Sequence, residues 1–95
     1  MIEEAQVIEA TGDTAIRATG GLVYAAQLTV DGVTAGDTVA LLDGDAGGTL
    51  RWRVIAHATD YVYTFTPSNP MRFNDGIYAK FTLTGGNAYL TVLYS

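Results

Sequence analysis

Hydrophobic and polar residues alternate most clearly in the stretch Thr38–Ala58, around which we expect the rest of the chain to be organised. Two runs in this stretch, Thr38–Asp43 and Thr49–Ala58, are separated by the polar, glycine-rich segment Gly44–Gly48. A hydrophobic period of two residues is typical of a β-strand with one buried face. The pattern therefore predicts a hairpin whose second strand brings the only tryptophan of the chain into the core.

Shorter strands are expected elsewhere, because similar runs are separated by glycine, proline or aspartate, the residues that favour turns. These strands are Ile2–Ala10, Thr14–Thr19, Leu22–Val30, Tyr61–Thr66, Met71–Phe73, Ile77–Thr84 and Ala88–Tyr94. The first is expected to be an edge strand or an extended arm, and a short helix over Glu3–Ala10 is the alternative. The final three strands are joined by tight turns and are expected to form an antiparallel meander.

The same alternation assigns faces to the longer strands. In Thr49–Ala58 the buried face carries Leu50, Trp52, Val54, Ala56 and Ala58, and the opposite face carries Arg51, Arg53, Ile55 and His57. In Leu22–Val30 one face carries Leu22, Tyr24, Ala26, Leu28 and Val30. In Tyr61–Thr66 one face carries Tyr61, Tyr63 and Phe65. In Ile77–Thr84 the inward residues are Ile77, Ala79, Phe81 and Leu83.

Seven or eight short strands with a turn at nearly every break indicate an all-β fold. Short connections exclude a parallel sheet, which needs long crossovers. We therefore expect one domain over residues 1–95, a small antiparallel β-sandwich or jelly roll of seven to eight short strands.

The composition indicates that part of the surface meets another protein. Only 16% of the residues are charged, against about 25% in an average domain. There is no cysteine to supply a disulfide, and a domain this small is marginal by itself. We therefore expect a homo-oligomer. A net charge of −5 argues against binding to nucleic acid or to an anionic membrane. Without a basic, apolar leader, the chain is expected to be made in a cytoplasm.

No pattern of catalytic or metal-binding residues is found. The single histidine, His57, lies within a predicted strand, and the two serines, Ser68 and Ser95, lie in a loop and at the terminus. Asp43-Gly44-Asp45 resembles half of a calcium loop, but the later ligands are absent. We expect a protein that is not an enzyme and that needs no metal and no cofactor.

The ten aromatic residues are the remaining candidates for function. Most are expected in the core, and those that are exposed would suit a subunit interface, where tyrosine is enriched, or a sugar-binding surface. The candidate interface residues are Ile2, Val7, Tyr24, Arg51, Arg53, His57, Tyr61 and Tyr78.

Several short turn and strand segments follow one another between Leu22 and Tyr94, a range that covers about three quarters of the chain. They are Gly32–Gly44, Gly48–Leu50, Val54–Ala56, Phe65–Pro67, Arg72–Ala79, Leu83–Ala88 and Val92–Tyr94. This order is similar to a class of small β-sandwich virion proteins that tailed bacteriophages encode near their capsid genes. The resemblance implies a head decoration or accessory structural protein of the virion, without catalytic residues and assembled in copies, with a trimer as the expected state.

The expected function is therefore to decorate or stabilise a phage capsid through self-association and through binding to the major capsid protein or another virion protein. Two alternatives stay open. One is a carbohydrate-binding β-sandwich module, and the other is a tail or fibre component of the same particle.

Overall fold

The structure, a computed structural model, describes residues 5–95, which form nine β-strands and no helix. The strands are β1 (Gln6–Ala10), β2 (Thr14–Arg17), β3 (Gly21–Asp31), β4 (Thr38–Asp43), β5 (Thr49–Ile55), β6 (Asp60–Phe65), β7 (Met71–Phe73), β8 (Ile77–Thr82) and β9 (Asn87–Tyr94). The prediction of an all-β chain is confirmed, and a strand stands where a short helix was the alternative. In this described part, no helix is long and apolar enough to span a membrane.

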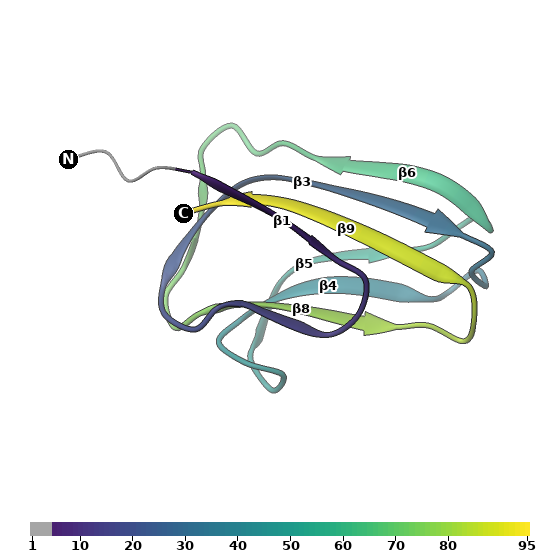
Figure 1. Cartoon of the computed structure of the whole chain (residues 1–95), viewed down its shortest axis with the longest axis horizontal. Coiled ribbons are helices and arrows are strands. Elements are labelled where there is room, and N and C mark those ends of the chain that lie inside the picture. The colour runs from purple at the N-terminus through teal and green to yellow at the C-terminus, as the bar shows by residue number, and fades with distance from the viewer. Residues whose placement is uncertain (1–4) are drawn as a thin grey trace.

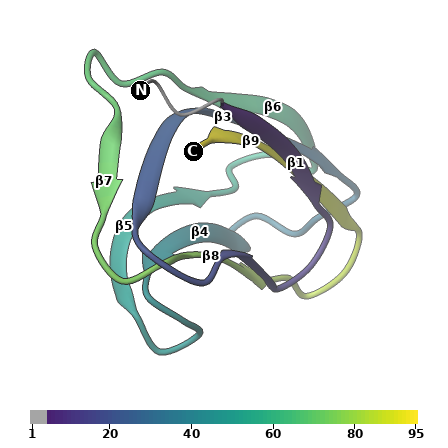
Figure 2. The same cartoon turned by 60° about the vertical axis from the view of Figure 1, so that its left-hand side comes forward.

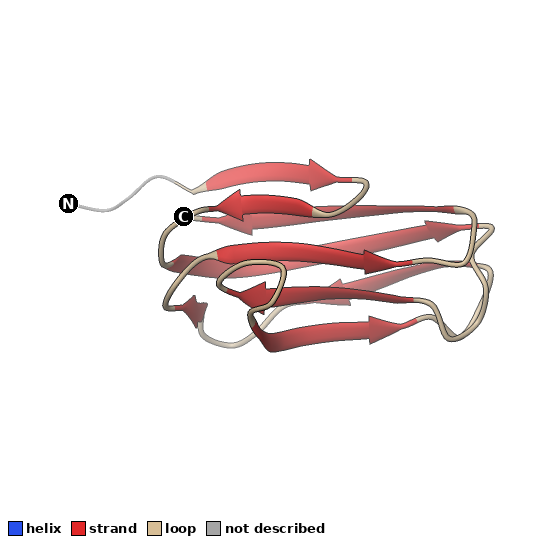
Figure 3. Ribbon diagram, turned by 90° about the horizontal axis from the view of Figure 1, so that it is seen from below, coloured by secondary structure: helices blue, strands red, loops and turns tan. Residues whose placement is uncertain are grey.

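Two antiparallel sheets are packed face to face. Sheet A has the strand order β1-β9-β3-β6, with β7 also paired to β3, and sheet B has the order β2-β8-β4-β5. Figure 1 shows them as two layers, with β6, β3 and β9 in the upper layer and β5, β4 and β8 in the lower one. The strands run along the long axis of the molecule (Figure 3). The β-sandwich prediction is confirmed.

The strand order is that of a jelly roll. Strand β7 pairs with β3 at Gly21–Val23, and β6 pairs with the same edge of β3 further along. The two act as one edge strand, interrupted by residues 66–70, where two prolines lack the amide that a strand ladder needs. Figure 2 shows β7 as a short separate piece after this loop. When β6 and β7 are counted as one strand, the chain has eight strands. The first pairs with the last (β1 with β9), and the nested pairs inside it are β2 with β8, β3 with β6, and β4 with β5, as in a jelly roll.

The predicted meander of the last three strands is wrong. Strand β8 lies in sheet B between β2 and β4, whereas β9 lies in sheet A between β1 and β3. The tight turn between them crosses from one sheet to the other. At this turn Gly86, with φ of 74°, packs against the backbone of Gly32, with φ of 72°, in the β3–β4 connection. A short turn alone does not show whether the next strand joins the same sheet.

Two β-bulges shift the faces that were predicted for β3 and β5. In β3, Val23 is paired with Tyr94 but Ala25 with Leu93, so one extra residue reverses the alternation. Val23 is fully buried in place of its neighbour Tyr24, and the predicted common face of Leu22 and Tyr24 with Ala26 is wrong.

In β5, Trp52 is paired with Leu41 but Leu50 with Leu42, which leaves Arg51 as the extra residue. Leu50 is therefore not buried with Trp52 and is 47% exposed. The rest of the predicted buried face holds for Trp52 and Val54, which pack against the core, and for Ala56, which is buried.

The core lies between the sheets and draws evenly on both. Its fully buried side chains include Val23, Leu28, Leu90 and Val92 from sheet A and Val39, Leu41, Ile77 and Ala79 from sheet B. Phe81 and Leu83 pack against it, as predicted for the inward face of their strand. Burial of each larger side chain contributes about 1.5–3 kcal/mol.

A buried carboxylate fastens two loops together at one end of the sandwich. Asp37 accepts hydrogen bonds from the Thr34 amide at 3.0 Å, from the Thr84 hydroxyl at 2.9 Å and from the Thr84 amide at 3.1 Å. The bond from the Thr34 amide is the main cause that holds the pKa of Asp37 below its ordinary value, and burial opposes the shift. The carboxylate thus joins the β3–β4 loop to the segment that follows β8.

We predict that Gly86→Ala destabilises the fold by about 2 kcal/mol. An added Cβ would meet the carbonyl group of Gly32, and φ at this position lies in the left-handed region. The measurement is urea unfolding. Gly85→Ala is the matched control, since its Cβ would meet nothing within 4 Å. Equal losses in the two variants would contradict this account of the turn.

We predict that acid weakens the fold through Asp37. Its pKa is lower in the folded chain than in the unfolded chain, so its contribution is complete above the ordinary aspartate pKa of about 3.9. That contribution is lost as the pH falls through the lower, folded value. Thermal unfolding between about pH 7 and pH 2.5 should therefore show a smaller acid-induced loss in Asp37→Asn than in the wild type. The matched control is Asp75→Asn, which removes an exposed loop charge. Its unfolding temperature should fall with acid as steeply as that of the wild type.

Candidate functional site: the two outer sheet faces and an aromatic cluster

The outer face of sheet A, here the A face, is apolar and threonine-rich. Residues paired across strands point to the same side of a sheet. The register therefore gives three rows on this face: Val7, Leu93 and Ala25; Glu9, Thr91, Gln27 and Thr64; and Tyr89, Thr29 and Val62. Val7 is 66% exposed and Val62 is 47% exposed. Strands β1, β9, β3 and β6 contain no lysine or arginine.

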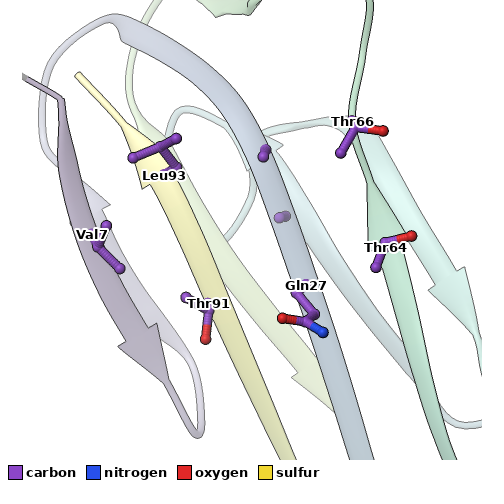
Figure 4. A pocket seen from close by; sticks show the side chains of 8 residues that line it. Val7, Gln27, Thr64, Thr66, Thr91 and Leu93 are labelled. Atoms are coloured by element: carbon purple, nitrogen blue, oxygen red, sulfur yellow. The ribbon is translucent and has the colours of Figure 1, made fainter.

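A shallow depression of about 340 Å³ lies on the A face. Figure 4 shows the side chains that line it, which come from neighbouring strands of sheet A and the residue after β6: Val7, Gln27, Thr64, Thr66, Thr91 and Leu93. Methyl groups of valine, leucine and threonine alternate here with hydroxyl groups and one amide. Such a surface can pack against apolar groups and exchange a few hydrogen bonds, but it offers no charge to a ligand.

The outer face of sheet B, here the B face, carries positive charge. Its middle row is Lys80, Ala40 and Arg53, in which two cations flank a buried alanine. The rows on either side are Ala15, Tyr78, Leu42 and Leu50, and Thr82, Thr38 and Ile55. Ile55 is 55% exposed. The B face therefore combines exposed aliphatic groups with positive charge.

An aromatic cluster lies where β5 leads into β6. The Tyr63 hydroxyl accepts a hydrogen bond from the His57 amide at 3.0 Å and lies 2.8 Å from Nδ1 of the same histidine. The ring of Tyr61 lies 4.7 Å from that of His57 and 4.8 Å from that of Tyr63. Further along β6, Phe65 stacks on Trp52 at 5.3 Å. The cluster thus joins the edge strands of the two sheets, while Tyr61 remains 50% exposed.

The acidic loop Asp43-Gly44-Asp45 is held to the loop before β8 through the carboxylate of Asp43. The Asp43 carboxylate accepts hydrogen bonds from the amides of Asn74 at 2.9 Å and Asp75 at 2.8 Å. These bonds, that from Asn74 first, hold the pKa of Asp43 below its ordinary value, and the Arg51 charge adds a smaller effect. Within residues 5–95, no group of three or more acidic, histidine or cysteine side chains could hold a metal ion. Asp43 therefore ties the β4–β5 loop to the residues before β8.

The predicted interface residues do not form one patch. Val7 lies on the A face, whereas Arg53 and Tyr78 lie on the B face, with Tyr78 only partly exposed. His57 and Tyr61 meet in the aromatic cluster, and Arg51 is exposed at the bulge of β5.

The Tyr24 hydroxyl is bonded to the Ser95 hydroxyl at 2.9 Å, near the C-terminal end of the chain. Ile2 lies outside the described residues.

Sequence reasoning missed several residues of the two faces, among them Val62, Tyr89, Leu93, Leu50 and Lys80. Alternation within Tyr61–Thr66 did separate Val62 from Tyr61 and Tyr63. What it lacked was the neighbouring strand, because an exposed valine becomes part of a patch only when Thr29 and Tyr89 are placed beside it.

We predict that Tyr63→Phe lowers the free energy of unfolding by about 1 kcal/mol, since it removes the hydroxyl that bonds His57. Urea unfolding followed by the fluorescence of Trp52 measures this loss. The matched control is Tyr61→Phe, which also removes one hydroxyl but leaves the His57–Tyr63 bonds in place. A larger loss in the control than in Tyr63→Phe would refute the assigned role of the hydroxyl.

Comparison of the chain with protein-family models, with curated proteins and with solved structures gave no match.

Proposed function

We propose that the chain is a structural, non-enzymatic component of a tailed-bacteriophage virion, which decorates or stabilises the capsid by binding other protein subunits. The observation that carries this proposal is the A face. It presents Val7, Val62 and Tyr89 to solvent, and strands β1, β9, β3 and β6 carry no lysine or arginine, the one basic residue of sheet A being Arg72 on β7. An apolar surface with an exposed tyrosine and no lysine is typical of a protein–protein interface.

The jelly-roll strand order supports the proposal in a more general way. This architecture is used by viral capsid proteins, lectins and cupins. A fold alone does not identify a function. The A face favours a protein partner over a small charged substrate, because it exposes mainly methyl and hydroxyl groups.

A second candidate, a carbohydrate-binding module, is favoured by one observation. Tyr61 is half exposed and is held from one side by His57 and Tyr63. A fixed aromatic ring with one free side can stack on a sugar. Tyr78, by comparison, lies between Ala15 and Leu42 in a row of the B face and is less accessible. We rank this candidate second because it rests on one half-exposed ring.

We predict that purified particles of the phage that encodes this chain contain it in stoichiometric amounts. Mass spectrometry of gradient-purified particles measures this. Val62→Asp should lower its incorporation at least about tenfold, because a carboxylate in the apolar A face would lose its water on binding. Ala46→Asp is the matched control, since it adds the same charge to an exposed loop away from both faces.

Particles that lack the chain would refute the virion role. Equal incorporation of Val62→Asp and the wild type would refute the part assigned to the A face. Binding of a glycan by the wild-type chain, lost in Tyr61→Ala, together with absence from particles, would favour the carbohydrate-binding function.

A further inference from the structure

The charged residues of the sandwich are separated between its two outer faces. On the A face the charged side chains are Glu9 in the middle row and Asp31 and Asp60 in the last row, beside Asn87. On the B face they are Lys80 and Arg53, with Arg51 at the bulge of β5. The sheets thus turn a negative face and a positive face in opposite directions. Arg72 of β7 is paired with Leu22 and adds one exposed cation to the outer side of sheet A. Asp13, whose carboxylate accepts a hydrogen bond from the Phe81 amide, adds one exposed carboxylate next to Lys80. Each face keeps its sign, because the three charges named for it outnumber the single opposite one.

Four of these charged side chains have no partner among residues 5–95. Glu9, Asp31, Arg53 and Lys80 are all exposed. Among the described residues, no hydrogen bond or ion pair within the chain occupies them. They contribute nothing to the core, which lies on the opposite side of each sheet. Their charges are therefore free to act on a partner.

Each face also carries exposed apolar side chains next to its charges. On the A face these are Val7, Val62 and Tyr89, and on the B face they are Leu50 and Ile55. The rows of the A face run from Leu93 to Asn87, which is about 20 Å along the strands, and four strands give a width of about 20 Å. The face therefore covers roughly 400 Å², about half the area that each partner buries in a standard-size stable interface.

We propose that the negative A face of one copy binds the positive B face of a second copy. Contact between two A faces would oppose the carboxylates of Glu9 and Asp31 to those of the other copy. Contact between two B faces would likewise oppose Lys80 and Arg53 to each other. Only the A-to-B contact pairs opposite charges while it covers the apolar groups of both faces, and like charges across an interface cost several kcal/mol.

This arrangement is heterologous, because the two surfaces in contact are different. Each copy retains one free A face and one free B face, so assembly continues until a ring closes or a chain forms. The inference rests on the proposed structural function and specifies its first partner, a second copy of the chain.

The test reverses the charges of each face. One variant carries Glu9→Lys with Asp31→Lys, a second carries Arg53→Glu with Lys80→Glu, and a third carries all four substitutions. Sedimentation velocity over micromolar concentrations measures self-association, and circular dichroism checks the fold. The matched control, Asp45→Lys with Asp75→Lys, makes the same change of net charge in the loops as the first variant makes on the A face.

The wild type should form assemblies larger than a dimer, and salt should weaken them. Each two-residue variant should raise the dissociation constant at least about tenfold, whereas the four-residue variant should restore it to within about threefold. The loop control should associate as the wild type does.

Three results would overturn the inference. A wild type that stays monomeric at about 100 µM would show that the faces do not bind each other. Weakening by only one of the two variants would indicate a symmetric contact. If the four-residue variant does not recover the affinity of the wild type, the charges of the A face and those of the B face do not contact each other. Because incorporation into particles is measured independently, a monomer that is present in particles refutes this inference alone. A self-assembling chain that is absent from particles refutes only the virion role.

Discussion

The fold depends on the insertion of β9, the last strand, between β1 and β3. Without β9 the first strand has no neighbour in sheet A, and Leu90 and Val92 are missing from the core. The pairing extends to the final residue, since Leu22 and Ser95 exchange two backbone hydrogen bonds of 3.0 Å. The continuous A face exists only after this strand is in place, because its middle row runs from Glu9 through Thr91 to Gln27 and Thr64.

Sheet geometry leaves the outer side of each layer of the sandwich available for contact with a partner. Each strand shows alternate side chains to the core and to solvent, so a two-layer sandwich has two outer faces whose composition is free of packing demands. In this chain the two outer faces differ in charge and share exposed apolar groups, with Lys80 and Arg53 on one side and Glu9 and Asp31 on the other. Core packing does not require that separation, whereas a partner that contacts both faces would.

Aspartates and glycines at the loops hold the strands at the positions that create these faces. Asp37 and Asp43 each accept hydrogen bonds from backbone amides of a distant loop. In the segment Asp43-Gly44-Asp45, which resembles half of a calcium loop, the Asp43 carboxylate thus bonds backbone amides of another loop. Gly86 allows the chain to pass from sheet B to sheet A in contact with Gly32, where a side chain would not fit. These loop contacts stabilise the crossing between the sheets once non-local pairing has placed the strands.

The sequence by itself determined the all-β class, the Thr38–Asp43 strand with its hairpin partner, and the inward residues of Ile77–Thr84, because period-two alternation and turn residues are local properties. Tertiary structure alone decided the rest. The bulges that moved Val23 inward and Leu50 outward depend on register with another strand. The meander failed because a turn does not specify the sheet. The A face combines residues from four strands far apart in the chain, and only non-local pairing brings such residues onto one surface.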